Sequence, residues 1–342
     1  MKIFDCFLFF DELDLLEIRL DVLYPHVDQF VIVESAITFQ GNAKPFNLEQ
    51  SWARFSKYAD KITYLKIDAY DIDFSCPPFI EAPECEDDVI VNRIYQHVLE
   101  CPHFDKKREF WWGNDFFQRE CLWRALALAK PSDGDLILIS DVDEIPNPVT
   151  LSSLKPSIKP NIVNCFRQHE FCYYLNYYHN SDWLGTCAFL YGAFKHHSLN
   201  SIRFATKRNE GLNAFIIEDG GWHFTSLGNV EKIQQKVMNW GHREFNSPFI
   251  LKAVEYNVVH GYDIFRRPGF GRMHRRPLDD KIFGPDLPSM FARFPQLVGP
   301  EITSESPLAA VAFSCYFFLQ QKWSSLKRKL VKSGKTGGTV RS

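Results

Sequence analysis

The feature that most constrains the fold is a set of short apolar runs separated by helical patterns in the first half of the chain. Residues 3–10, 30–35 and 62–67 are apolar and have the length of buried strands. Leucines recur at helical spacing over residues 12–23, and a second helical segment is expected at 51–60. This strand and helix alternation predicts an α/β fold with a mostly parallel central sheet and helices on both faces.

A fourth apolar run ends in a concentration of acidic residues. A strand predicted at 135–140 is followed by Asp141, Asp143 and Glu144. Ligands of open α/β sheets gather at the carboxyl ends of the strands. Because side chains alternate along an extended chain, we expect Asp141 and Asp143 to point to the same side. Two neighbouring carboxylates repel each other unless a cation neutralises them, and Mg²⁺ and Mn²⁺ suit oxygen ligands. The pattern predicts a metal site for a phosphorylated substrate, with a solvated acidic cap as the alternative.

The composition argues against several classes of protein. Apolar residues make up 45% of the chain, which is enough for a large core and argues against wholesale disorder. A net charge of −3 gives no indication of nucleic-acid binding. The nine cysteines contain no CxxC pair, so we expect reduced thiols in a cytoplasmic protein rather than a zinc ribbon or a disulfide framework.

The two ends of the chain raise the question of membrane contact. The N-terminal apolar run is interrupted by Asp5 and precedes no cleavage site, so we interpret it as a strand and not as a signal peptide. The apolar segment 308–319 is shorter than the roughly 18 residues that a spanning helix needs. The basic segment 322–335 follows it, and this combination is typical of peripheral contact with an anionic membrane. A packed final helix with a solvated tail is the alternative.

We expect three parts along the chain. Residues 1–150 form the regular α/β half, 151–300 form a less regular half, and 301–342 form a C-terminal helix and basic tail. Residues 70–113 interrupt the alternation with prolines and charge clusters, which predicts an insertion with a short helix near 88–99.

Four segments in the same order resemble glycosyltransferase family 17, a family of N-acetylglucosaminyltransferases. They are 5-DCFLFFDELDLLEIRL-20, 31-VIVES-35, 136-LILISDVDEIP-146 and 220-GGWHFTSLG-228. The resemblance extends over roughly residues 3–67 and 114–265. It implies a GT-A-like fold, an inverting transfer from a UDP-sugar such as UDP-GlcNAc in the presence of Mn²⁺ or Mg²⁺, and a glycan acceptor. The N-terminal half then becomes the nucleotide-sugar half, and the second half binds the acceptor.

The metal ligands and the general base are expected around two of these segments. Asp141 and Asp143 would hold the ion, and His223 is a third candidate ligand that could instead be a core histidine. We expect the glycines before it to let the backbone approach a ligand. An inverting transfer needs one general base. Asp219 is the preferred candidate and Glu218 the second.

Glu144 is a further candidate for the base, although orienting the metal site is the role we expect for it. For the donor we expect contacts from Phe10, Asp11, Glu12, Glu34, Asn114, Gln118, Arg119 and Asp141. Asn114 should cap a helix that runs to about Ala129. Arg119 could bind the diphosphate, or it could be a surface residue of that helix.

Three further alternatives stay open. A sugar nucleotidyltransferase usually has a glycine-rich, basic phosphate loop near its N-terminus, whereas 9-FFDELD-14 is acidic and lacks glycine. A non-catalytic glycan-binding protein of transferase descent would be favoured if the acidic residues were missing, but they are present. The aromatic residues of 173–183, with Trp222, form either a stacking wall for a sugar or part of the core.

Overall fold

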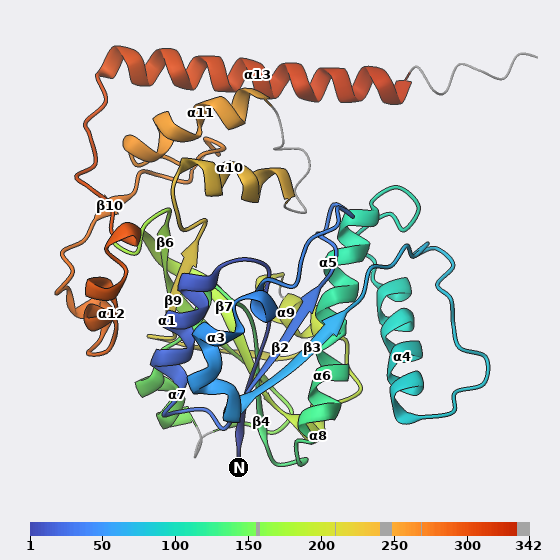
Figure 1. The fold of residues 1–342 in the computed structure, drawn as a ribbon. Coiled ribbons are helices and arrows are strands. Elements are labelled where there is room, and N and C mark those ends of the chain that lie inside the picture. Colours follow the sequence, from blue (N-terminus) through green and yellow to red (C-terminus); the bar gives the residue numbers. More distant parts are fainter. Residues whose placement is uncertain (155–157, 209, 240–247, 268, 334–342) are drawn as a thin grey trace, which may run out of the picture.

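The fold is built around one large sheet (Figure 1). The structure is a computed structural model that describes residues 1–154, 158–208, 210–239, 248–267 and 269–333. Within these residues the sheet has ten strands, and eight of them follow the order β3-β2-β1-β4-β7-β6-β9-β5. The α/β fold class predicted from the sequence is confirmed.

The predicted strands form the parallel part of the sheet. They are β1 (Ile3–Leu8), β2 (Gln29–Ser35), β3 (Ile62–Ile67) and β4 (Leu136–Asp141). β1 lies between β2 and β4 and is parallel to both, while β3 is parallel to β2. The carboxyl ends of these strands therefore meet at one edge, as expected for a ligand site of an α/β sheet.

The second half of the chain continues the same sheet and makes it mixed. The remaining strands are the short β5 (Glu144–Pro146), which precedes the second half, and β6 (Val163–Cys172), β7 (Tyr177–Leu190), β8 (Ala214–Ile217), β9 (Gly221–Thr225) and β10 (His274–Arg275) within it. β7 is antiparallel to β4 and to β6, and β5 is antiparallel to β9. β9 runs parallel to β6. Residues on both sides of position 150 thus share one sheet.

Helices cover both faces, which confirms that prediction (Figure 1). One face packs against α1 (Leu13–Leu23), α3 (Trp52–Phe55), α7 (Pro148–Leu154) and α12 (Leu287–Arg293). The other packs against α4 (Glu86–Glu100), α5 (Phe110–Glu120), α6 (Leu122–Ala129) and α9 (Leu199–Lys207). The reason is the alternation of side chains along each strand: Phe7 of β1 belongs to the first core and Cys6 to the second.

The shorter helical segments connect these elements. They are α2 (Asn47–Gln50), η1 (Ser56–Lys61), α8 (Tyr191–Phe194), η3 (Lys281–Phe283) and η4 (Pro295–Leu297). Within the segment 70–113, α4 corresponds to the helix expected near 88–99.

The helix predicted from Asn114 differs from the structure at its start. α5 begins at Phe110, with Glu109 at the N-cap position, and Cys121 separates it from α6. Asn114 is therefore an interior residue and not a cap. Its side-chain Nδ2 donates to the Phe39 carbonyl oxygen at 2.9 Å, so the residue makes a tertiary contact with the loop after β2.

Three helices form a layer beyond the sheet (Figure 1). They are α10 (Val230–Asn239), α11 (Pro248–Val259) and α13 (Pro307–Ser333). Apolar residues at helical spacing over residues 229–240 predict a helix, and α10 forms there; Trp240 and the tail residues 334–342 lie outside the described residues. Within the described ranges no helix combines the length and apolarity that crossing a membrane requires. The nine cysteines all lie within the described residues, and none of them forms a disulfide.

Candidate functional site

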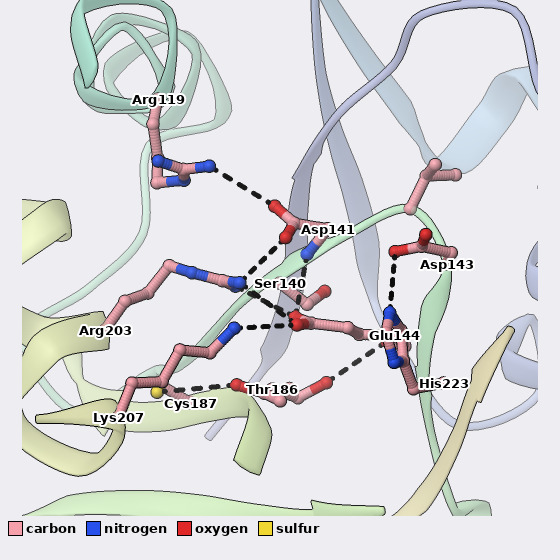
Figure 2. A network of polar contacts seen from close by, with 12 residues as sticks. Arg119, Ser140, Asp141, Asp143, Glu144, Thr186, Cys187, Arg203, Lys207 and His223 are labelled. Atoms are coloured by element: carbon pink, nitrogen blue, oxygen red, sulfur yellow. Dashed lines mark hydrogen bonds and ion pairs between the residues drawn. The ribbon is translucent and has the colours of Figure 1, made fainter. Parts of the chain in front are cut away.

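The acidic residues after β4 form a tight turn. β4 ends at Asp141, Val142 and Asp143 make the turn, and β5 begins at Glu144. Because the chain reverses here, the expectation that Asp141 and Asp143 point to the same side is wrong. Figure 2 shows that the two carboxylates contact different side chains.

Arg19 of α1 fixes the backbone of this turn. Its guanidinium is fully buried and forms a bidentate pair with Asp5 of β1, with N–O distances of 2.8 and 2.6 Å. Nη2 also donates to Ser140 Oγ at 2.6 Å. Nη1 donates to the backbone oxygens of Asp141, Val142 and Glu144. One side chain therefore satisfies three carbonyl groups of the turn and sets its shape.

Arg19 and Asp5 are not among the residues predicted from the sequence, although a signal is present there. Asp5 interrupts an apolar strand, and Arg19 lies between Ile18 and Leu20 in an apolar helix. Charged groups are rarely buried unless they are paired. Two opposite charges on neighbouring buried elements could therefore have been predicted to meet.

Asp141 is held by two arginines. Arg203 Nη2 of α9 lies 2.8 Å from Asp141 Oδ2, and Arg119 Nη2 of α5 lies 3.5 Å from Oδ1 (Figure 2). Burial raises the pKa of Asp141, but the attraction of Arg203 and Arg119 outweighs it and the pKa falls below its usual value. The carboxylate is therefore charged and already neutralised by protein cations.

Glu144 is buried in a network of donors. Arg203 and Lys207 of α9 lie 2.9 and 3.3 Å from its carboxylate oxygens, and the Trp183 indole donates to it at 3.0 Å. Although burial raises the pKa of Glu144, these cations bring it well below the usual value. Since an effective general base has a pKa near the working pH, this environment favours an orienting role over that of the base.

Asp143 and His223 lie together on the other side of the turn. Asp143 Oδ1 is 3.7 Å from His223 Nε2, and Lys236 Nζ is 3.3 Å from Asp143 Oδ2. His223 Nδ1 faces Glu170 Oε1 at 3.5 Å, and the Trp183 ring stacks on the imidazole at 4.0 Å. A carboxylate on one ring nitrogen orients the other, as in many metal-binding histidines. The imidazole is thus aimed at Asp143.

Glu170 is suited to this supporting role. Burial raises its pKa, but the hydrogen bond with His179 and the attraction of the His179 and His223 imidazoles lower it to about 2. His179 Nδ1 lies 2.6 Å from Glu170 Oε2, so the carboxylate bridges two imidazoles. β6 carries Glu170 and β9 carries His223, and the two residues are register partners across the parallel pair.

A pocket opens beside Asp143 at the carboxyl ends of β1 and β4. It has an empty volume of about 620 Å³, which includes space open to solvent. Its lining residues are Phe10, Asp11, Glu12, Asp14, Leu15, Asp143, Phe224, Ser226, Leu227, Lys232, Lys236 and Leu297. The loop after β1 thus shares the pocket with one acid of the turn and with two lysines of α10, which the sequence motifs did not indicate.

The charges in this pocket influence one another. Burial raises the pKa values of Asp11 and Glu12, although nearby lysines oppose the shift. Burial lowers the pKa of Lys236, but attraction from Asp143 and Glu12 outweighs it, so that the pKa is raised and the ammonium group stays charged. The pocket therefore combines carboxylates with cations that could neutralise a phosphorylated ligand.

Glu34 lies outside the pocket and serves the loop after β2. It is fully buried and pairs with Lys44 at 2.7 Å. It accepts hydrogen bonds from the Asn47 and Leu48 amides and from the Tyr64 hydroxyl. Asn47 in turn donates to the Phe10 carbonyl oxygen at 2.6 Å, so Glu34 reaches the pocket only through this loop.

The three predicted residues of α5 also lie outside the pocket. Asn114 and Gln118 donate to the carbonyl oxygens of Phe39 and Ile37 and so hold the same loop. Arg119 pairs with Asp115 at 2.8 Å and with Asp141. These contacts place Arg119 beside the turn rather than on the surface.

Glu218 and Asp219 precede β9, whereas the pocket lies at the end of that strand. Glu218 is exposed and pairs with Arg167 at 3.0 Å. The Asp219 carbonyl oxygen accepts hydrogen bonds from Asn147 and Thr150, and its φ is +51°. Both carboxylates are therefore separated from the pocket lining by the length of β9.

The two glycines at the start of β9 serve strand packing. Gly221 has a φ of +116°, and a side chain there would collide with the Ile145 carbonyl oxygen. A side chain at Gly220 would collide with Phe166 and the backbone of Arg167. The glycines therefore allow the backbone of β9 to lie close to β5 and β6. This packing explains the two glycines without the approach to a ligand that we expected.

The aromatic residues divide between the core and the site. Trp222, Tyr173 and Tyr177 are buried, and the Trp222 indole donates to the Ile282 carbonyl oxygen at 2.7 Å. Core packing therefore accounts for them. Trp183 is partly exposed between His223 and Lys207, whose ammonium lies 4.4 Å from its ring centre.

The described residues offer a partial fit to a metal ion. Among them no group of three or more His, Cys, Asp and Glu side chains has the arrangement of a preformed metal site. Asp143 and His223 provide an oxygen and a nitrogen donor in the same place, and Mn²⁺ accepts both. Asp141 is directed at the arginines instead.

A charged pocket at the carboxyl edge of parallel strands is typical of α/β enzymes that bind nucleotides or other phosphorylated ligands. A sequence model of glycosyltransferase family 17 matches residues 1–89 and 84–267, and the chain belongs to this family. It is therefore a glycosyltransferase whose substrates are a sugar donor and an acceptor. The matched ranges include residues 70–113, which we expected to lie outside the resemblance. A comparison with curated proteins found no match.

Proposed function

We propose that the protein transfers GlcNAc from UDP-GlcNAc to a glycan acceptor, with inversion to a β linkage and with a divalent ion, Mn²⁺ or Mg²⁺. The observation that carries this proposal is the pocket in which Asp143 and the loop after β1 meet Lys232 and Lys236. Four parallel strands followed by an acidic turn also agree with a GT-A-like fold.

The donor binds in this pocket with its diphosphate toward α10. Lys232 and Lys236 line the pocket from α10, and Lys236 is already within 3.3 Å of Asp143. The two ammonium groups compensate the negative charge of a diphosphate, which four pocket carboxylates would otherwise repel. Phe10 adds an apolar ring to the pocket lining, against which the nucleoside can pack.

Asp143 and His223 hold the divalent ion. Glu170 faces the other ring nitrogen of His223, so Asp143 and His223 would offer an ion one oxygen and one nitrogen ligand. Asp141 joins them only if its carboxylate leaves Arg119 and Arg203. When bound, the ion stabilises the negative charge that develops on the departing nucleoside diphosphate.

We consider four carboxyl groups as the general base: two that are exposed and two whose pKa values are raised. Asp219 stays our first candidate and Glu218 the second; both are exposed, although the length of β9 separates them from the pocket lining. Asp11 and Glu12 are a third possibility inside the pocket, because burial raises their pKa values toward the range of an effective base. These candidates are distinguished by measuring kcat at saturating substrate for the variants Asp219→Asn, Glu218→Gln and Glu12→Gln. Only the variant that lacks the base should lose the acceptor-dependent rate.

The donor assignment is tested by thermal unfolding with UDP-GlcNAc, UDP-Glc, UDP-Gal and GDP-Man, each with and without Mn²⁺. UDP-GlcNAc with Mn²⁺ should give the largest rise in the unfolding temperature, since a ligand that binds only the folded state stabilises it. The proposal is wrong if none of the four nucleotide sugars raises the unfolding temperature under any condition.

A further inference from the structure

α13 is attached to the rest of the molecule along one side. Phe317 is buried, and its ring centre lies 4.7 Å from that of Phe249 on α11. One turn earlier, Phe313 stacks on Tyr256 of α11 at 4.3 Å. Figure 1 shows the helix lying across α11 and extending beyond it.

The opposite side of α13 exposes a stripe of large apolar side chains. Leu308 is 86% exposed, Val311 and Leu319 are each 63% exposed, and Phe318 is 55% exposed. Val311 follows Leu308 by three residues, and Phe318 and Leu319 follow Val311 by seven and eight, which places the four side chains on one face of a helix. Soluble proteins rarely expose a continuous apolar surface without a partner for it.

The charge of α13 indicates what kind of partner it has. The helix contains Lys322, Lys327, Arg328, Lys329 and Lys332 and no acidic residue. The whole chain has a net charge of −3 and α13 contributes +5, so the remaining residues carry −8. A second copy of the same helix lying alongside would be repelled, whereas an anionic surface would be attracted.

We propose that α13 binds the surface of an anionic membrane. The stripe of Leu308, Val311, Phe318 and Leu319 enters the boundary between headgroups and acyl chains, and the positive charge of the helix is attracted to the lipid phosphates. The acidic remainder of the chain is repelled by the same surface, which sets the orientation.

This orientation links the membrane to the donor pocket. α13 packs on α11, α11 packs on α10, and α10 carries Lys232 and Lys236 of the pocket lining. The three helices are stacked between the membrane-binding stripe and the sheet (Figure 1). The enzyme would thus work at a membrane surface without a spanning helix in its described part.

Sedimentation with vesicles tests the proposal. The protein is mixed with vesicles of phosphatidylcholine alone, or of phosphatidylcholine and phosphatidylserine in equal parts. The double variant Val311→Glu, Leu319→Glu should bind the mixed vesicles at least about tenfold more weakly than the unchanged protein, because it loses apolar contacts and adds repulsion. Binding of the unchanged protein should require phosphatidylserine and weaken with salt.

A matched control separates the stripe from general effects of charge. Leu128 of α6 and Val149 of α7 are 61% and 63% exposed, so Leu128→Glu, Val149→Glu makes the same changes elsewhere on the surface. This control should bind vesicles like the unchanged protein. Equal binding by the two double variants, or equal binding to both kinds of vesicle, would overturn the proposal.

Two further measurements keep the test decisive. Circular dichroism should give the same helix content and unfolding temperature for both double variants. If the α13 variant unfolds, the single variant Leu308→Glu repeats the test at the most exposed position.

Sedimentation velocity without lipid should give a monomer. A dimer that the stripe variant dissociates, together with absence of vesicle binding, would assign the stripe to self-association instead. None of these outcomes depends on the identity of the sugar donor.

Discussion

At the scale of single residues, the acidic turn depends on cations that come from distant parts of the chain. The run of Asp141, Asp143 and Glu144 is recognisable in the sequence because its residues are adjacent. Arg19 and Arg203 are separated from it by at least 59 residues, as their hydrogen bonds to Glu144 show. No local sequence pattern indicates that these arginines contact the acidic turn. The acidic residues could therefore be predicted from the sequence, but the cations that bind them could not.

Replacing Arg19 tests this dependence. Arg19→Met should lower the free energy of unfolding by about 3–5 kcal/mol, because it leaves Asp5 buried without its partner and removes the three hydrogen bonds that Nη1 donates to the turn. Denaturant unfolding measures the change. Arg108→Met is the control, since Arg108 is 83% exposed and its pair with Asp105 is long, and it should change stability by less than about 1 kcal/mol. Equal effects of the two variants would show that Arg19 has no special role.

Lys236 is the residue through which the donor pocket can be tested without changing an acid. Lys236→Gln should weaken binding of UDP with Mn²⁺ by about tenfold or more, since hydrogen bonds to charged groups contribute about 1.5–3 kcal/mol. Isothermal titration calorimetry measures the affinity. Lys252→Gln on the exposed side of α11 is the matched control and should bind UDP normally. Unchanged affinity in Lys236→Gln would place the diphosphate elsewhere.

At the scale of elements, the parallel strands were predictable and the second half was not. β1, β2 and β4 are buried on both faces, β3 is partly buried, and helices separate the four strands, so each is a distinct apolar run. β6 and β7 pair with register shifts at three places, and β5 and β10 have only three and two residues. Such strands have no clear period in the sequence, and their positions are set by partners elsewhere in the sheet.

α9 shows how one buried carboxylate positions an element of the site. Glu120 accepts hydrogen bonds from the Ser198 hydroxyl and from the Leu199 and Asn200 amides at the start of α9. α9 carries Arg203 and Lys207 to Glu144. Burial raises the pKa of Glu120, but contacts with His97 and with these donors outweigh it, so that the pKa lies below its ordinary value of 4.5.

This pKa gives a pH dependence with a defined sign. Because the folded state has the lower pKa, the stability that Glu120 contributes is present above about pH 4.5 and is lost as the pH falls through the folded value. Glu120→Gln should therefore be less stable by about 1–3 kcal/mol at neutral pH, with a smaller difference in acid. Thermal unfolding at several pH values measures it, and Glu100→Gln at an exposed position is the control. A difference that does not shrink in acid would contradict the argument.

At the scale of the whole molecule, the family and the pocket agree on sugar transfer. The family model extends over most of the chain, and the pocket joins residues of the N-terminal half to α10 in the second half. Three of the four sequence motifs, 5–20, 136–146 and 220–228, contribute residues to the pocket lining, whereas the motif 31–35 does not. They could not reveal Lys232 or Lys236, since lysines on one helix are ordinary unless the opposite wall of the pocket is known.

The central claim is that Asp143 acts on a nucleotide-sugar donor in this pocket, and release of UDP from UDP-GlcNAc with Mn²⁺ tests it most directly. Asp143→Asn should release UDP at least about 100-fold more slowly than the unchanged protein, because it removes a carboxylate that would hold the divalent ion beside the departing diphosphate. Asp71→Asn, at an exposed position in the segment 70–113, should release UDP at the normal rate. A normal rate in Asp143→Asn, with the protein folded, would contradict the account.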